Sequence, residues 1–270
     1  MTRLTVEDLN RGPKDLNTYD QELKAITGMN LLELALKSTD MTLKRYKSKV
    51  TSLKWVAVIP TSIGEGILLG FSEKIAEVGC YLGLPCQVTM TKDVAGVGEA
   101  VAGGSEMIVI ADDSTFLALN LISRRVVNNS TATGEIYAVA LACASKGVAD
   151  RYVGVLGLGP VGYAGANWLC SQGARLIVHD KDHKKQTSFL SRRGDIRGAS
   201  SVEEVISLTD IVLDATNASD IIKVRELKGR LILAAPGIPL GIDDPNSHMV
   251  QLIHDPLQLG VAAMMVQALA

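Results

Sequence analysis

Cysteine is scarce in this sequence, which also has almost no net charge and no long apolar run. The four cysteines form no CxxC pair and no zinc spacing, so we expect buried free thiols, no metal ion and a reducing cytoplasm. The net charge of −2 argues against a general attraction to nucleic acid or to an anionic membrane. No apolar run could span a bilayer, and the N-terminus lacks a signal-peptide core.

A glycine-rich turn is the most informative feature that the chain does have. It runs Gly157-Leu158-Gly159-Pro160-Val161-Gly162, directly after the apolar run Tyr152–Leu156 and before an apolar helix pattern at Tyr163–Leu169. A second strand pattern, Arg175–His179, then ends at Asp180. Strand, glycine turn, helix, strand and acid in this order are typical of a dinucleotide-binding unit. Asp180 would accept hydrogen bonds from the adenosine ribose and repel a 2′-phosphate, which predicts NAD rather than NADP.

The 270 residues are enough for two ordinary domains. In the second half, strand patterns alternate with helix patterns and end in an apolar helix at 260–270, which predicts a Rossmann-type doubly wound parallel sheet over residues 151–270. Residues 1–150 read as a smaller domain with a helical start followed by an α/β region. A buried helix at 133–146 would link the two halves, and the alternating strands and helices of the second half predict a parallel sheet covered on both faces.

Ligands of open parallel sheets bind beyond the carboxyl ends of the strands. After the strand pattern at Ile211–Asp214, Thr216 and Asn217 could donate to the ribose or phosphates, although Asn217 could equally cap a following helix. After the strand pattern at 230–235, Pro236 and Gly237 form either a plain turn or a loop that approaches the nicotinamide ring.

Two polar pairs stand out in the first half. Asp112 and Asp113 follow the strand pattern Met107–Ile110, where they would either cap a helix or bind a cation. Asn128 and Asn129 lie between apolar segments, where they would form either a turn or a wall of the ligand cleft. The residues alone do not separate these alternatives.

Together these blocks make the chain resemble one family, the dehydrogenase of pyrrolysine biosynthesis, nearly from end to end. The resemblance rests on Leu4-Thr5-x-Glu7-Asp8-Leu9, Gly64-Glu65-Gly66-Ile67, Phe71-Ser72-Glu73, Ala111–Ala118, Asn128-Asn129, Thr133-Gly134-x-Ile136-Tyr137-Ala138, the glycine turn, Pro236-Gly237-Ile238-Pro239, Pro256-Leu257 and Gly260. The resemblance implies NAD-dependent oxidation of lysine acylated on its side-chain nitrogen by 3-methylornithine. The oxidised terminal carbon would then be attacked by the neighbouring α-amine, and ammonia would leave as the pyrroline ring closes.

The same resemblance implies site residues and a homodimer. Asp113 and Asp255 would be the catalytic carboxylates that hold substrate ammonium groups, and the family commonly has glutamate at the position of Asp255. Substrate contacts would come from Leu4, Ser62, Asp112, Asp113, Asn128, Asn129 and Asp255. The cofactor contacts would come from Gly157, Leu158, Gly159, Pro160, Val161, Gly162, Asp180, Thr216, Asn217, Pro236 and Gly237.

Two other functions remain open from the residues. The first is another NAD-dependent amino-acid dehydrogenase or a cyclodeaminase, enzymes that usually carry a lysine or histidine at the reacting carbon. The second is a non-catalytic NAD-sensing module, which would not need the polar pairs at Asp112–Asp113 and Asn128–Asn129.

Overall fold

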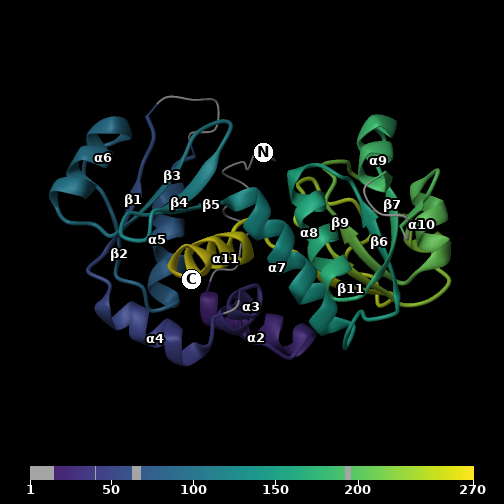
Figure 1. The fold of residues 1–270 in the computed structure, drawn as a ribbon. Coiled ribbons are helices and arrows are strands. Elements are labelled where there is room, and N and C mark those ends of the chain that lie inside the picture. The colour runs from purple at the N-terminus through teal and green to yellow at the C-terminus, as the bar shows by residue number, and fades with distance from the viewer. Residues whose placement is uncertain (1–14, 40, 63–67, 192–195) are drawn as a thin grey trace.

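A computed structural model describes residues 15–39, 41–62, 68–191 and 196–270. These residues form two β-sheets with helices between and around them (Figure 1). Leu4, which the family resemblance assigns to the substrate, lies outside the described residues.

The first sheet has the strand order β2-β1-β3-β4-β5. Its strands are β1 (Val56–Ile59), β2 (Cys86–Val88), β3 (Met107–Ala111), β4 (Phe116–Asn120) and β5 (Arg125–Asn128). β1 pairs in parallel with β2 and β3, whereas β4 and β5 are antiparallel to their neighbours. The first sheet is therefore mixed, parallel on one side and antiparallel on the other.

The hairpin between β3 and β4 results from Asp112. Its Oδ1 accepts hydrogen bonds from the backbone N–H groups of Ser114 and Thr115, both at 2.7 Å. An aspartate that bonds its own backbone in this way turns the chain within a few residues. The interpretation of Asp112 and Asp113 as helix caps is wrong, because β4 follows them and not a helix.

Five helices are described before residue 129: α2 (Leu16–Thr27), α3 (Leu31–Lys37), α4 (Leu43–Ser52), α5 (Phe71–Tyr81) and α6 (Asp93–Ala102). Polar side chains cap the N-termini of the first three of these helices. Asp15 caps α2, Asn30 caps α3 in a reciprocal pair with Glu33, and Thr42 caps α4. No helix within the described ranges has the length and apolar character needed to cross a membrane.

The second sheet has the strand order β11-β10-β9-β6-β7-β8, with every described pairing parallel. Its strands are β6 (Tyr152–Leu156), β7 (Arg175–His179), β8 (Arg197–Gly198), β9 (Ile211–Asp214), β10 (Leu231–Ala234) and β11 (Val250–Ile253). The helices α8 (Pro160–Ser171), α9 (His183–Leu190) and α10 (Val202–Leu208) and the 3₁₀ turn η1 (Val224–Glu226) connect them. The chain moves outward from β6 to β8 and then returns to β9 on the other side, which confirms the predicted Rossmann-type sheet.

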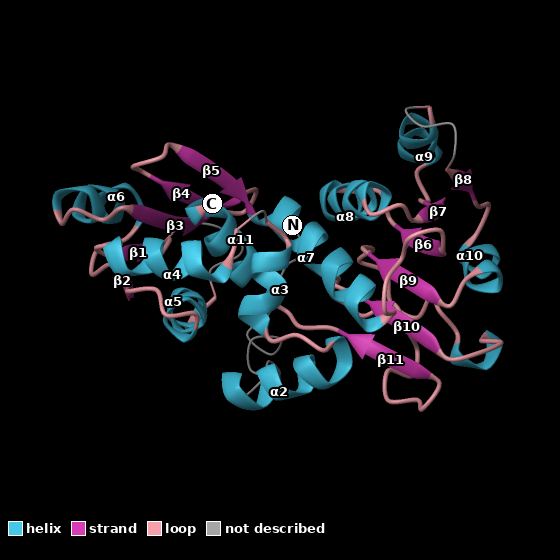
Figure 2. Cartoon of the chain, turned by 60° about the horizontal axis from the view of Figure 1, so that its bottom comes forward, coloured by secondary structure: helices cyan, strands magenta, loops and turns pink. Residues whose placement is uncertain are grey.

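Two helices, α7 (Asn129–Ala144) and α11 (Gln258–Leu269), lie between the two sheets (Figure 2). α7 approaches α8 closely because both have glycine at the crossing. A Cβ on Gly134 would lie 2.1 Å from the carbonyl oxygen of Val161, and one on Gly165 would lie 2.9 Å from that of Gly134. The first turns of α7 are thereby held against the start of α8, at the end of the glycine turn.

α11 follows the second sheet but packs against α3, α5, α7, β4 and β5 of the first half. All of its residues are buried, which explains why its sequence is apolar apart from Gln258 and Gln267. The division into domains 1–150 and 151–270 stays a prediction. The expectation of buried thiols holds for Cys86, whose pKa burial raises to about 12, but it is wrong for Cys80, which is exposed.

Candidate active site

A cleft lies where α7 and the first sheet face the carboxyl edge of the second sheet. Its described lining comes from the start of α5, β4, α7, the glycine turn, the loops after β9, β10 and β11, and α11. The lining residues are Phe71, Phe116, Asn129, Ser130, Thr133, Tyr137, Val161, Ala215, Pro236, Gly237, Ile238, Asp255, Pro256, Leu257 and Gly260.

The glycine turn forms the floor of one end of this cleft, and its three glycines have distinct surroundings. Gly157 has φ of +82°, a left-handed conformation that favours glycine. A Cβ on Gly162 would lie 1.9 Å from the carbonyl oxygen of Gly157, so the start of α8 can approach the strand only without a side chain there. Gly159, by contrast, has no heavy atom within 4 Å of its ideal Cβ position. The turn therefore offers bare backbone, together with the free N–H groups of α8, to an anionic ligand.

Asp180 is positioned by the same turn. Its carboxylate is only 7% exposed and accepts hydrogen bonds from the backbone N–H of Leu158 at 2.6 Å and of Asp182 at 2.8 Å. The acid at the end of β7 is thus fixed beside the glycine turn, as the predicted ribose contact requires.

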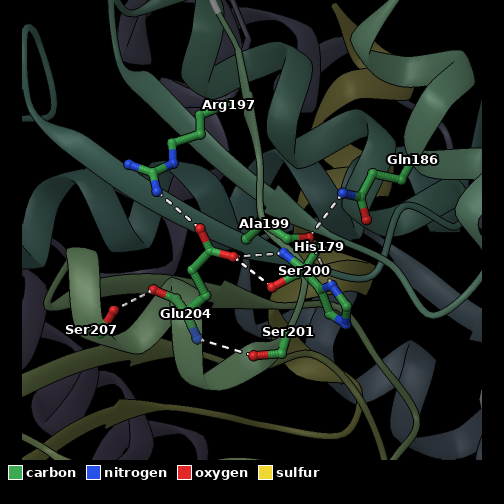
Figure 3. A network of polar contacts seen from close by, with 8 residues as sticks. All are labelled: His179, Gln186, Arg197, Ala199, Ser200, Ser201, Glu204 and Ser207. Carbon is green, nitrogen blue, oxygen red and sulfur yellow. Dashed lines mark hydrogen bonds and ion pairs between the residues drawn. The ribbon is translucent and has the colours of Figure 1, made fainter.

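A polar network holds the neighbouring loop next to Asp180 (Figure 3). The side chain of Gln186 accepts from the backbone N–H of Asp180 and donates to the carbonyl oxygen of Ala199. Glu204 accepts from the backbone N–H and hydroxyl of Ser200 and from the guanidinium of Arg197, and these hydrogen bonds lower its pKa to about 2. The loop beyond β8 is therefore anchored through an ionised carboxylate.

The loops after β9 and β10 touch at Gly237. A Cβ on Gly237 would lie 1.9 Å from the carbonyl oxygen of Thr216, so the absence of a side chain lets the loops meet. The hydroxyl and N–H of Thr216 donate to the buried carboxyl of Asp214, at 2.7 Å and 3.0 Å. Burial raises the pKa of Asp214, and the Thr216 hydrogen bonds oppose that shift. Asn217 is exposed, and the helix-cap interpretation is wrong because the described chain continues from it as a loop.

Asp255 ties four segments together at the base of the cleft. Its Oδ2 accepts from the hydroxyl of Tyr19 in α2 at 2.5 Å, and its Oδ1 accepts from the backbone N–H groups of Leu257 and Leu259. The hydroxyl of Tyr137 in α7 donates to its backbone carbonyl at 2.7 Å. Burial raises the pKa of Asp255, while the Tyr19 hydrogen bond opposes the shift. No sequence pattern indicated a role for Tyr19, whereas Tyr137 falls inside one of the family blocks.

The two asparagines at the start of α7 point to different surroundings. The Asn128 side chain accepts from the backbone N–H of Ser130 at 2.8 Å and so caps α7, while the residue lines a groove outside the cleft. Asn129 lines the cleft itself, with Thr133 and Tyr137 one and two turns further along the same face of the helix. The hypothesis of a cleft wall thus fits Asn129, and that of a turn residue fits Asn128.

Besides Asn128, three predicted substrate residues stand apart from the cleft lining in the described part of the chain. Asp112 is engaged in the β3–β4 turn, and Asp113 beside it is exposed. Ser62 is exposed, and both its backbone N–H and its hydroxyl bond the carboxylate of Asp93. The cleft does contain Phe116, three residues beyond Asp113, together with Asn129 and Asp255. The substrate roles of Asp112, Asp113 and Ser62 stay predictions.

Comparison with known proteins identifies the family. Residues 8–127 match the model described as pyrrolysine biosynthesis protein PylD, N-terminal domain. The chain is 30% identical over 272 residues to a pyrrolysine synthase of Methanosarcina acetivorans, with 100% of both chains covered. It is 32% identical over 278 residues to a pyrrolysine synthase of Methanosarcina barkeri, which covers 100% of this chain and 98% of the relative. This chain belongs to the pyrrolysine synthase family. The predicted family resemblance is thereby confirmed.

Solved structures show which fold this member of the pyrrolysine synthase family has. A shikimate dehydrogenase from Aquifex aeolicus matches with a TM-score of 0.54 and 13% identity, over 80% of this chain and 90% of that one. A shikimate dehydrogenase in complex with NADP⁺ matches with a TM-score of 0.51 and 12% identity, over 81% and 94%. Family and fold together indicate an enzyme of pyrrolysine biosynthesis, built as a dehydrogenase, that acts on a small molecule.

Proposed function

We propose that this protein uses NAD to oxidise the terminal amine carbon of 3-methylornithine linked to the side-chain nitrogen of lysine. The carbon gives up a hydride and the amine one proton, so that R–CH₂–NH₂ becomes R–CH=NH. The neighbouring α-amine then adds to this imine or to the aldehyde that it hydrolyses to, ammonia leaves, and the pyrroline ring of pyrrolysine closes.

The observation that carries the proposal is the juxtaposition of the glycine turn with a cleft whose described lining contains no basic side chain. Val161 of the turn and Asn129 and Asp255 line the same cleft, and no lysine, arginine or histidine is among its described lining residues. A substrate with several ammonium groups favours such surroundings, because basic side chains would repel it. When bound, NAD supplies the carbon that accepts the hydride.

The residues proposed to hold NAD fit a dinucleotide on physical grounds. Gly159 leaves room beside the backbone, and α8 presents its N-terminal N–H groups to a pyrophosphate. Asp180, buried and fixed to the turn, supports NAD over NADP because a 2′-phosphate would meet a carboxylate in a half-buried site. Thr216, Asn217, Pro236 and Gly237 would approach the nicotinamide half from the loops after β9 and β10. A homodimer in the cytoplasm is part of the same proposal and rests on the family resemblance.

Spectrophotometry of the purified protein with NAD and lysine-linked 3-methylornithine tests this function. We expect accumulation of NADH together with release of ammonia. Release of ammonia without NADH would favour a cyclodeaminase, and NAD binding without either product would favour a sensing module.

A further inference from the structure

Two side-chain oxygens in the cleft have no hydrogen-bond partner. Asn129 Oδ1 and Thr133 Oγ1 are both buried, and neither has a partner within the described part of the chain. They are four residues apart on α7, so they lie one above the other on the face that lines the cleft. A buried polar atom without a partner costs about 1–3 kcal/mol, which a protein retains chiefly where a ligand completes the bond.

Both oxygens lie close to a glycine of α11. A Cβ on Gly260 of α11 would lie 2.4 Å from Thr133 Oγ1 and 3.1 Å from Asn129 Oδ1. Any other residue at 260 would press on both oxygens. The next position on the same face, Tyr137, has its hydroxyl bonded to Asp255, so the free hydrogen-bonding capacity of this face belongs to Asn129 and Thr133.

The complement of two neutral acceptors is a group with two N–H donors. The titratable residues in the described lining are Asp255 and Tyr137, and Tyr19 contacts Asp255 from α2. The Asp255 carboxyl already accepts three hydrogen bonds, from Tyr19, Leu257 and Leu259. Much of its hydrogen-bonding capacity is therefore used within the protein, whereas the side-chain oxygens of Asn129 and Thr133 have no partner among the described residues.

The opposite wall of the cleft consists of segments proposed to hold the cofactor. Val161, Ala215, Pro236 and Gly237 line it, and they belong to the glycine turn and to the loops after β9 and β10. A group bound by Asn129 and Thr133 would therefore face the proposed nicotinamide end of the cofactor. Under the proposed function, the reacting carbon of the substrate must lie beside the nicotinamide. The group with N–H donors at that position is the amine on this carbon.

We infer that Asn129 and Thr133 bind the reacting amine and select its neutral form. This inference rests on the proposed function and assigns the amine to these two residues. A neutral amine has two N–H donors for the two oxygens and one lone pair, which must remain free to form the C=N bond as the hydride leaves. An ammonium ion would have a third N–H and no lone pair. Because an amide oxygen and a hydroxyl carry no formal charge, they stabilise an ammonium ion less than a carboxylate does.

Proton release on binding tests the inference without relying on turnover. An alkylamine has a pKa near 10.4 in water, so it is charged at neutral pH and must lose a proton to enter this site as a neutral group. Calorimetry of lysine-linked 3-methylornithine with the protein saturated with NADH, in buffers of different ionisation enthalpy, measures that proton. We expect release of close to one proton for the wild-type protein.

Asn129→Asp places a carboxylate beside the amine and should abolish most of this release, while the kcat/KM profile moves to higher pH. Thr133→Val removes the hydroxyl at nearly constant shape and should lower kcat about tenfold or more, with NAD affinity unchanged. Thr131→Val is the matched control, because Thr131 is an exposed residue of the same helix that lines the groove outside the cleft. It should match the wild-type protein in both measurements.

Equal proton release by the wild-type protein and Asn129→Asp would overturn the inference, and so would a loss of NAD affinity in Thr133→Val, which would assign the pair to the cofactor. Both results can be distinguished from failure of the proposed function. If the proposed function is wrong, the wild-type protein itself forms no NADH. Thermal unfolding of each variant reveals misfolding, and Thr133→Ser, which retains the hydroxyl, should recover much of the kcat lost in Thr133→Val.

Discussion

Replacing Gly159 with alanine should separate cofactor binding from folding. Gly159 has φ of −66° and ψ of −177°, an extended conformation that alanine adopts without strain. Apart from Gly159 and its two chain neighbours, no described residue has an atom within 4 Å of the added Cβ. Alanine at such a position leaves stability unchanged or raises it by about 0.4–1 kcal/mol, because the unfolded chain loses conformational freedom. The same methyl group occupies the space through which a pyrophosphate would approach the backbone. We expect NAD to bind at least about tenfold more weakly, which corresponds to about 1.4 kcal/mol.

Gly162→Ala is the contrasting variant. Its Cβ would lie 1.9 Å from the carbonyl oxygen of Gly157, so we expect destabilisation by about 1–3 kcal/mol from overpacking. Thermal unfolding and calorimetric NAD titration of both variants provide the assay. Wild-type NAD affinity in Gly159→Ala would refute the assignment of the glycine turn to the dinucleotide.

Three further predictions concern carboxylates. The wild-type protein should have a higher kcat/KM with NAD than with NADP. Asp180→Asn should lower the ratio of these two kcat/KM values about tenfold. Equal rates of the wild-type protein with both cofactors would contradict the ribose contact. Asp113→Ala should greatly reduce turnover while NAD affinity stays close to that of the wild-type protein, and a parallel loss of both would assign Asp113 to the cofactor site or to the fold. Burial raises the pKa of Asp214, so the folded state holds its proton to higher pH than the unfolded state and stability falls as pH rises above about 4 through the folded pKa. Asp214→Asn should reduce this decline in melting temperature between about pH 4 and pH 7, and an unchanged decline would show that Asp214 does not contribute to it.

The second half of the fold could be predicted because its signals are local. The glycine turn, the apolar run before it and Asp180 after the next strand define a unit of consecutive elements, and the parallel pairing of β6 with β7 and β9 follows from the crossover helices. The fold of the first half was harder to predict, for an equally local reason. Asp112 followed by Asp113 resembles a helix start, yet the Asp112 side chain bonds Ser114 and Thr115 and produces a hairpin.

The cleft depends on contacts that no local pattern contains. Tyr19 bonds Asp255 across 236 positions of sequence, and Tyr137 bonds it across 118. Similarly, the unpartnered oxygens of Asn129 and Thr133 lie against Gly260, which belongs to the last described helix. Sequence blocks could indicate that Asn129 and Asp255 matter, but they could not indicate which atoms remain free.

The most direct test of the proposed oxidation is isotope transfer from substrate to cofactor. Lysine-linked 3-methylornithine deuterated at the terminal amine carbon would be incubated with the protein and NAD, and the reduced cofactor and the amino-acid product would be examined by mass spectrometry. We expect one deuterium in the reduced cofactor, the other retained on the ring carbon of the product, and one ammonia released for each. Product that keeps both deuterium atoms, or a reduced cofactor without deuterium, would contradict the account.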